Sequence, residues 1–166
     1  MFYKRVDIAI RAFNASGRRL VVVGQGEQDA DLRKIAGPNV VFLGRQPHDK
    51  VMELLSTCRA LVFPGLEDFG IIPLEAMASG RPVIAYGAGG ALETVIDGKT
   101  GILFTPQTPE ALEQAVVRFE DIERDFEPMT LRDYAKQFDK AVFKSRLQAF
   151  IDDHMSQDVS PMGALP

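Results

Sequence analysis

Short apolar runs alternate with amphipathic segments along most of the chain. The runs are continuously hydrophobic, which is typical of strands buried on both faces, and they occupy residues 20–23, 40–43, 60–63, 82–85 and 102–104. The segments between them carry apolar residues at the i, i+3, i+4, i+7 spacing of a helix: Val6, Ala9, Ile10 and Phe13; Val51, Leu54, Leu55 and Cys58; and Leu112, Ala115, Val116 and Phe119. This alternation predicts an α/β fold of the doubly wound, Rossmann-like class, with a mainly parallel sheet and right-handed crossovers. Ligands of such folds bind at the carboxyl ends of the strands.

Local signals place the ends of several helices. Gly80 is expected to end the helix that follows residue 70, and Thr108 with Pro109 is expected to begin the next long one. A last helix is predicted from Asp139 to His154. We therefore expect one domain over residues 1–154 and a flexible tail over residues 155–166, where no periodicity remains.

Composition excludes several classes of function. The chain has 166 residues and a net charge of -4, so it lacks the positive field that nucleic-acid binding requires. Cys58 is the only cysteine, and His48 and His154 lie far apart in the sequence, which argues against disulfides and zinc sites. No apolar run reaches the roughly 20 residues that cross a bilayer. A cytoplasmic protein without transmembrane segments is expected.

The densest motif runs from a predicted strand, through a glycine-containing loop, into a predicted helix at residues 63–80. The free N–H groups of Gly70–Ile72 would point outward at the positive end of that helix and could hold a diphosphate. Glu75, one turn further on, could accept hydrogen bonds from the vicinal hydroxyls of a ribose. In the alternative interpretation, Glu67 and Glu75 only stabilise the helix dipole.

Two other glycine motifs are weaker indications of a ligand site. The loop at residues 87–90 follows a strand and could pass close to a bound sugar, but a tight turn explains it as well. Gly24 and Gly26 suggest a dinucleotide fingerprint, but Asp29 occupies the place of its third glycine and would repel a pyrophosphate. Asp29 and Asp31 have the Asp-x-Asp spacing of a metal site, although they stand where a helix begins, so we predict a helix-end role and no metal.

Together these motifs resemble the carboxyl-terminal half of glycosyltransferase family 4, retaining enzymes of the two-domain GT-B architecture. The resemblance covers residues 3–151 and is most specific in Glu67 and Glu75, which are separated by seven residues. The accompanying motifs occur in the family's order: Val23-Gly-Gln-Gly26, Phe42-Leu-Gly-Arg45, Gly89-Gly-Ala-Leu-Glu93 and Asp97-Gly-Lys-Thr-Gly101. One departure is Asp68, where many members have glycine.

The resemblance implies a role for each matched position. Glu75 would hold the ribose, Gly70–Ile72 the diphosphate and sugar, and Glu67 the donor sugar, while Lys4 would neutralise the diphosphate leaving group. Glu67 and Lys4 are the predicted catalytic residues. The predicted donor-binding residues are Gly24, Gly26, Phe42, Leu43, Gly44, Arg45, Gly70, Ile71, Ile72 and Glu75.

The resemblance also implies a reaction. A hexose would pass from a nucleoside-diphosphate sugar to a hydroxyl acceptor without a metal or other cofactor. The sequence FPGLEDFGI at residues 63–71 favours GDP-mannose as the donor. The acceptor, a glycan or lipid-linked sugar, would bind through an amino-terminal domain, which could also bring the protein to a membrane surface. The alternative is a non-catalytic nucleotide-sugar binding module or an inactive fragment.

One family element has no counterpart in the sequence. Family members begin this domain with a central strand that ends in Gly-Arg just before the lysine, whereas here Met1 stands three residues before Lys4. We therefore expect a truncated transferase, or a half-enzyme completed by another polypeptide. The strands near residues 20 and 60 would then either pair directly or leave two unpaired edges.

Overall fold

The computed structural model describes residues 4–157, which form an α/β fold. The strands are β1 (Leu20–Val23), β2 (Val40–Gly44), β3 (Leu61–Phe63), β4 (Val83–Tyr86) and β5 (Gly101–Phe104). The helices are α1 (Val6–Ser16), α2 (Asp29–Ile35), α3 (His48–Thr57), α4 (Ile71–Ala78), α5 (Ala91–Thr94), α6 (Pro109–Ile122), α7 (Pro128–Ala135) and α8 (Lys140–Gln157), with 3-10 turns η2 (Glu123–Asp125) and η3 (Lys136–Phe138). The predicted alternation is confirmed, and each observed strand lies within one residue of its predicted ends.

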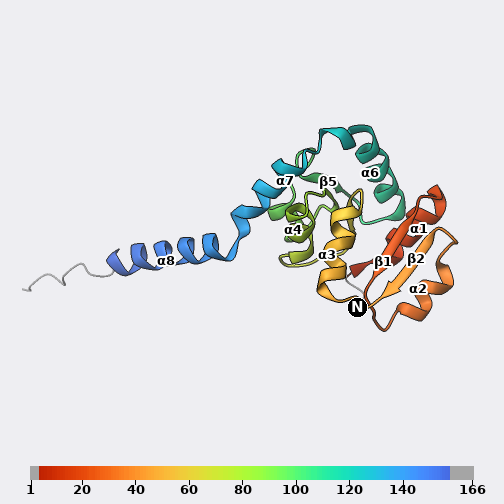
Figure 1. Cartoon of the computed structure of the whole chain (residues 1–166), viewed down its shortest axis with the longest axis horizontal. Coiled ribbons are helices and arrows are strands. Elements are labelled where there is room, and N and C mark those ends of the chain that lie inside the picture. Colours follow the sequence, from red (N-terminus) through yellow and green to blue (C-terminus); the bar gives the residue numbers. More distant parts are fainter. Residues whose placement is uncertain (1–3, 158–166) are drawn as a thin grey trace, which may run out of the picture.

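The strands form two separate parallel sheets rather than one. β1 pairs with β2, and β4 lies between β3 and β5. Among residues 4–157, no strand pairs with the second edge of β1 or of β3. Figure 1 shows β1 and β2 side by side at one end of the molecule, away from β5. Of the two expected outcomes, the structure therefore has the one with two unpaired edges.

The β1–β2 sheet is apolar on both faces but buried on only one. Leu20 is buried in the core with α1, which packs against both strands. Val21 and Val23 are each 38% exposed, and Val41 and Leu43 on β2 are each 36% exposed. The prediction of strands buried on both faces is thus wrong for β1 and β2, because α1 covers only the face that carries Leu20.

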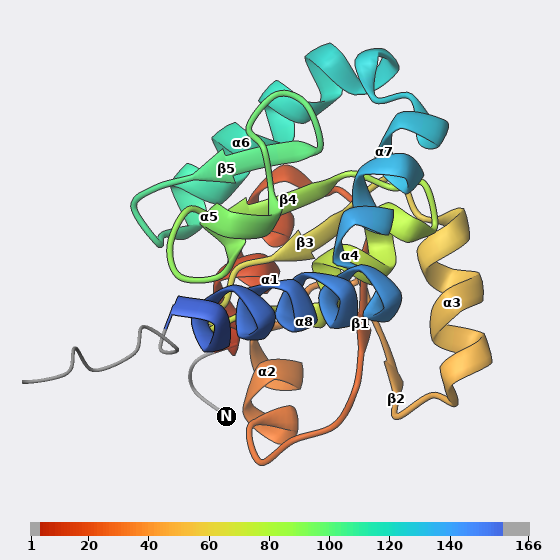
Figure 2. The same ribbon diagram turned by 90° about the vertical axis from the view of Figure 1, so that its left-hand side faces the viewer.

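The three-stranded sheet forms the core of the molecule. Val83, Ile84 and Ala85 of the middle strand β4 are almost completely buried, as a strand covered on both faces should be. Helices α1 and α6 cover one face, and α4 covers the other (Figure 2). The start of α6 follows the prediction, because the Thr108 hydroxyl accepts a hydrogen bond from the Ala111 N–H.

An ion-pair cluster joins the two sheets at the amino ends of their facing strands. Arg18 precedes β1, and its Nη2 lies 2.6 Å from Oε2 of Glu120 on α6. Arg59 precedes β3, and its Nη1 lies 3.3 Å from the other oxygen of Glu120. Arg59 also pairs with Glu123. The hydrogen bonds from Arg18 and Arg59 lower the pKa of the Glu120 and Glu123 carboxyls, respectively, below their ordinary values.

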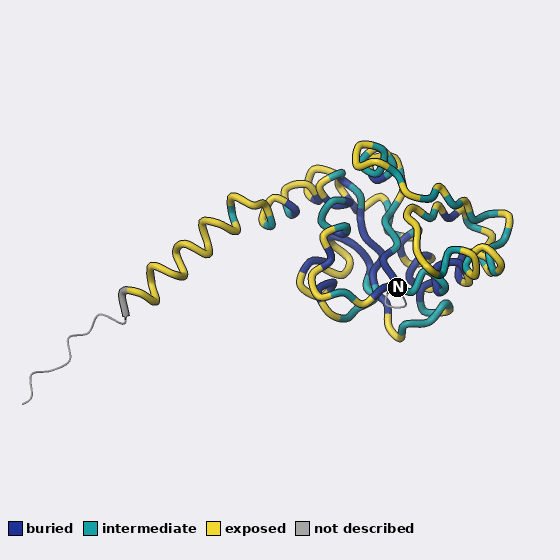
Figure 3. Tube along the Cα trace, turned by 90° about the horizontal axis from the view of Figure 1, so that it is seen from below, coloured by how far each residue is buried: buried dark blue, intermediate teal, exposed yellow. Residues whose placement is uncertain are grey.

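Helix α8 extends away from the rest of the protein (Figures 1 and 3). It runs from Lys140 to Gln157, so the predicted end at His154 is too early and residues 155–157 belong to the helix rather than to a tail. The remainder of the expected tail, residues 158–166, lies outside the described residues. The apolar side chains of α8 are exposed: Phe143, Leu147, Phe150, Ile151 and Met155. No helix within residues 4–157 is long and apolar enough to cross a membrane.

Candidate functional site

The loop between β3 and α4 places the amino end of α4 at the carboxyl end of the three-stranded sheet. Gly70 is the N-cap residue, with a φ of 76° that favours glycine. A Cβ atom at Gly70 would lie 3.3 Å from the Phe63 ring, so a larger residue would be crowded as well as strained. The first N–H groups of α4 are those of Ile71 and Ile72, and the early backbone N–H groups of a helix have no partner within it. This helix end is therefore available to an anion.

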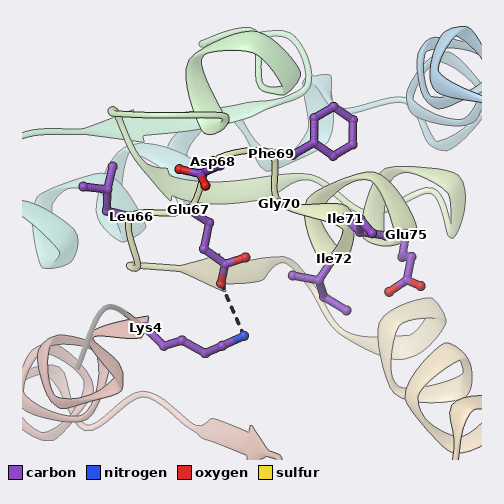
Figure 4. Close-up of a pocket in the computed structure, with 9 residues that line it drawn as sticks. All are labelled: Lys4, Leu66, Glu67, Asp68, Phe69, Gly70, Ile71, Ile72 and Glu75. Carbon is purple, nitrogen blue, oxygen red and sulfur yellow. Dashed lines mark ion pairs between the residues drawn. The ribbon is translucent and has the colours of Figure 1, made fainter. Parts of the chain in front are cut away.

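An open hollow of about 740 Å³ lies beside this helix end. Its volume is in the usual range for small-molecule sites. Figure 4 shows the residues that line it: Lys4, Leu66, Glu67, Asp68, Phe69, Gly70, Ile71, Ile72 and Glu75. The fold thus brings together Lys4, Glu67, Gly70–Ile72 and Glu75, all of which were predicted from the sequence.

Lys4 and Glu67 form an ion pair at the edge of the hollow. Nζ of Lys4 lies 3.3 Å from Oε1 of Glu67, and their side chains are 49% and 22% exposed (Figure 4). Oε1 is buried and accepts no hydrogen bond from the described residues, although it is in ion-pair contact with Lys4. A buried carboxylate oxygen in this state can accept a hydrogen bond from a ligand hydroxyl.

Glu75 lies at the other end of the hollow from Lys4 (Figure 4). It projects from the second turn of α4, and its carboxylate makes no hydrogen bond or ion pair with the described residues. The order across the hollow is therefore a lysine, a carboxylate, the amides of a helix end, and a second carboxylate. This order suits an elongated ligand with hydroxyls at both ends and an anionic centre.

The glycine motif at residues 87–90 packs against the backbone of the loop between β3 and α4. The Gly90 N–H donates to the Glu67 carbonyl oxygen at 2.9 Å. A Cβ at Gly90 would lie 2.4 Å from the Asp68 carbonyl oxygen, and a Cβ at Gly89 would lie 2.6 Å from that of Glu67. Gly89 has a φ of 58°, as the predicted tight turn requires. Both glycines also allow a close approach of two backbones, which the sequence did not predict.

The remaining predicted donor-binding residues lie at the carboxyl ends of β1 and β2: Gly24, Gly26, Phe42, Leu43, Gly44 and Arg45. The Gly24 N–H donates to the Gly44 carbonyl oxygen at 2.8 Å, which holds the two loops together. The Arg33 guanidinium lies 4.5 Å from the centre of the Phe42 ring. None of these residues lines the hollow beside α4. The structure therefore gathers the predicted residues into two groups, one on each sheet.

The Asp-x-Asp pair has partners within its own helix. Asp29 lies 2.9 Å from Arg33, and Asp31 lies 2.7 Å from Lys34. The hydrogen bond from Lys34 lowers the pKa of Asp31. These contacts fit the helix-end role. Over residues 4–157, no three His, Cys, Asp or Glu side chains gather into a group that could hold a metal ion.

Sequence reasoning gave no role to two residues of the hollow, Leu66 and Phe69. They flank the Glu67–Asp68 segment and are 49% and 46% exposed. Large apolar side chains that remain exposed beside a candidate site are a useful signal. The sequence alone could not reveal this signal, because the exposure of Leu66 and Phe69 is known only from the structure.

Comparison with known proteins identifies the family. The family model for glycosyl transferases group 1 matches residues 2–139. The chain belongs to this family. The uncharacterized glycosyltransferase MJ1178 of Methanocaldococcus jannaschii is 32% identical over 142 residues, which cover 82% of this chain and 40% of that protein. The alpha-1,3/1,6-mannosyltransferase ALG2 of Dictyostelium discoideum is 50% identical over 68 residues, or 40% of this chain and 16% of that enzyme.

Solved structures share the fold of this chain. The crystal structure of Anabaena HepE in complex with UDP matches 91% of this chain and 46% of that protein, with a TM-score of 0.79 and 26% identity. HepE in complex with UDP-glucose matches with a TM-score of 0.76 and 25% identity. The fold is thus the Rossmann-like carboxyl-terminal half of a GT-B fold. The chain spans less than half the length of these relatives.

Proposed function

We propose that this chain is the donor-binding half of a retaining glycosyltransferase that transfers a hexose from a nucleoside-diphosphate sugar to a hydroxyl acceptor. The observation that carries the proposal is the order of groups in the hollow. The amides at the amino end of α4 would hold the diphosphate, Glu75 the ribose hydroxyls, and Glu67 the sugar hydroxyls. Support comes from relatives named as glycosyltransferases and from HepE, whose structure contains UDP-glucose.

Lys4 would stabilise the departing diphosphate. Negative charge builds up on the leaving group as its bond to the sugar breaks, so a lysine and helix-end amides beside it would lower the barrier. In the present structure Lys4 pairs with Glu67. Donor binding would therefore require Lys4 to turn from the carboxylate toward the phosphates, while Oε1 of Glu67 gains a sugar hydroxyl as its donor.

The charge of the hollow indicates that the site is completed by further residues. Lys4 is the only lysine or arginine among the described residues that line the hollow, and three carboxylates line it as well, those of Glu67, Asp68 and Glu75. A diphosphate would bring additional negative charge. We propose that a further strand inserts between the free edges of β1 and β3 and brings another cation to the site. An amino-terminal domain would bind the acceptor, a glycan or lipid-linked sugar.

Mannose is the proposed donor sugar. The segment that matches ALG2 belongs, in that relative, to a protein named as a mannosyltransferase. The structures of HepE contain UDP and UDP-glucose, so a uridine donor is the rival. A second candidate function is a nucleotide-sugar binding module without transfer, which needs only the groups of the hollow.

Calorimetric titration with GDP, UDP, GDP-mannose and UDP-glucose tests the proposal. Glu75→Ala should remove a charge-assisted pair of hydrogen bonds to the ribose, with a loss of roughly 1.5–3 kcal/mol of binding free energy. The matched control is Glu110→Ala, which removes an exposed carboxylate on α6 outside the hollow. Equal affinity of the parent and the Glu75→Ala variant would refute the ribose role. Transfer to a sugar acceptor would rule out the module.

A further inference from the structure

Phe69 lies in the loop between β3 and α4, residues 64–70, which we call the donor loop, and it extends toward the carboxyl-terminal helices. Its ring points away from the carboxylates of Glu67 and Glu75 in Figure 4. It meets the ring of Phe138 edge to face, with centroids 6.4 Å apart and an interplanar angle of 64°. Phe138 in turn meets Tyr134 at 5.6 Å and 62°. The three rings form a continuous chain from the donor loop to helix α7.

Helix α7 is itself fixed against α4, the helix whose amino end forms the hollow. A Cβ at Gly80, just beyond the carboxyl end of α4, would lie 3.0 Å from Pro128 Cβ and 3.3 Å from Arg132 Nε. Leu131, on α7, is completely buried. The segment α7–η3 thus makes two contacts. Helix α7 packs near the carboxyl end of α4, and Phe138 of η3 contacts the donor loop, which leads into the amino end of α4. A rigid support of this kind can set the position of a loop relative to a helix.

The donor loop rests on two supports. Its backbone at Glu67 and Asp68 lies directly on Gly89 and Gly90, with no room for a side chain between them. On the other side, the contact with Phe138 holds Phe69, the residue between Asp68 and the N-cap Gly70. The glycine contact and the aromatic contact therefore restrain the loop at two different points.

We propose that Phe138 is a positioning residue for the donor loop, an inference that rests on the proposed function. Phe138 does not line the hollow, and it acts through Phe69 on the two groups that flank that residue. These groups are the Glu67 carboxylate and the first amides of α4. Because α8 begins two residues after Phe138, the position of α8 is linked to the donor loop through this same ring.

The test compares the parent chain with Phe138→Ala, Phe138→Tyr and Phe69→Ala. Hydrogen–deuterium exchange without ligand reports on the loop itself. An edge-to-face aromatic pair supplies enough free energy that its loss should speed exchange in residues 68–72 about three- to tenfold. Titration with GDP and UDP should show a loss of affinity of about the same factor. Phe138 is partly exposed and tyrosine keeps its aromatic ring, so Phe138→Tyr should leave both values close to those of the parent.

Phe143→Ala is the matched control, because Phe143 is a 62% exposed phenylalanine on α8, beyond the aromatic chain. It should change neither exchange in residues 68–72 nor affinity. If Phe138→Ala lacks a cooperative thermal transition, Phe69→Ala, which removes a 46% exposed ring, decides the question. Unchanged exchange in residues 68–72, or changed exchange with unchanged nucleotide affinity, would overturn the proposal. Absence of nucleotide binding by the folded parent would instead refute the proposed function, and exchange would still report whether Phe138 fixes the loop.

Discussion

Nζ of Lys4 lies 3.3 Å from Oε1 of Glu67, so the cation that lines the hollow is held by a carboxylate of the same hollow. The Lys4 side chain is half exposed and can turn toward a bound anion. A diphosphate brings more charge than a single carboxylate and accepts several hydrogen bonds. Exchange of Lys4 from Glu67 to phosphate oxygens would free Glu67 for a hydroxyl at the moment the donor arrives.

Lys4→Met should weaken binding of nucleoside diphosphates selectively. Loss of one charge-assisted contact to phosphate corresponds to about a tenfold increase in the Kd of GDP or UDP. The Kd of the corresponding nucleoside, which has no phosphate, should stay the same. The matched control is Lys99→Met, since Lys99 is an exposed lysine outside the hollow. Equal weakening of nucleoside and diphosphate binding would argue against contact between Lys4 and the phosphates.

Gly90→Ala should displace the donor loop. The added Cβ would lie 2.4 Å from the Asp68 carbonyl oxygen and 2.5 Å from Phe69 Cα, so backbone atoms must move. We expect a loss of about 1–3 kcal/mol in the free energy of unfolding, together with weaker nucleotide binding. Gly26→Ala is the control for stability alone, because a Cβ there meets no atom within 4 Å, whereas Gly26 is itself a predicted donor-binding residue. Chemical denaturation and calorimetry measure the two effects, and a Gly90→Ala protein indistinguishable from the control would contradict the close backbone approach.

The elements of this fold were predictable because their signals are local. Apolar runs and helical spacing depend on neighbouring residues, and they located all the strands described here within one residue. The residues of the hollow were also predictable, because the sequence from Glu67 to Glu75 forms one loop and one helix. Lys4 was predictable only through the family resemblance, since nothing local links it to Glu67.

The features that sequence reasoning missed depend on contacts between distant segments. Phe69 and Phe138 meet although they are far apart in the sequence and belong to no shared pattern. The sequence left open whether β1 and β3 pair directly or keep unpaired edges. The structure has unpaired edges. This choice depends on how whole sheets pack, which local sequence patterns do not predict. The two exposed valines of β1 follow from that arrangement, although their sequence is that of a strand buried on both faces.

Substitution of the apolar side chains of α8 should leave the stability of the domain unchanged. Phe143 and Phe150 are 62% and 61% exposed, so Phe143→Ser combined with Phe150→Ser should change the free energy of unfolding by less than about 0.5 kcal/mol. Leu112→Ala is the contrasting variant, because Leu112 is completely buried and its truncation should cost about 2–5 kcal/mol. Thermal melting measures both. A large loss of stability in the double serine variant would mean that α8 packs against the domain in solution.

The ion pairs of Glu120 should make stability depend on pH in the acidic range. Arg18 and Arg59 hold the pKa of Glu120 below its ordinary value, so the unfolded chain binds a proton more readily than the folded one. The resulting stabilisation is fully present above the unfolded pKa of about 4.5 and is lost as the pH falls through the folded value. Because these groups are partly exposed, Glu120→Gln should cost only about 0.5–1 kcal/mol at pH 7, or about 1–4 °C in Tm. The difference in Tm between parent and variant should shrink as the pH is lowered toward 3, and a difference that stays constant from pH 7 to 3 would show that the carboxylate charge of Glu120 does not stabilise the contact between the two sheets.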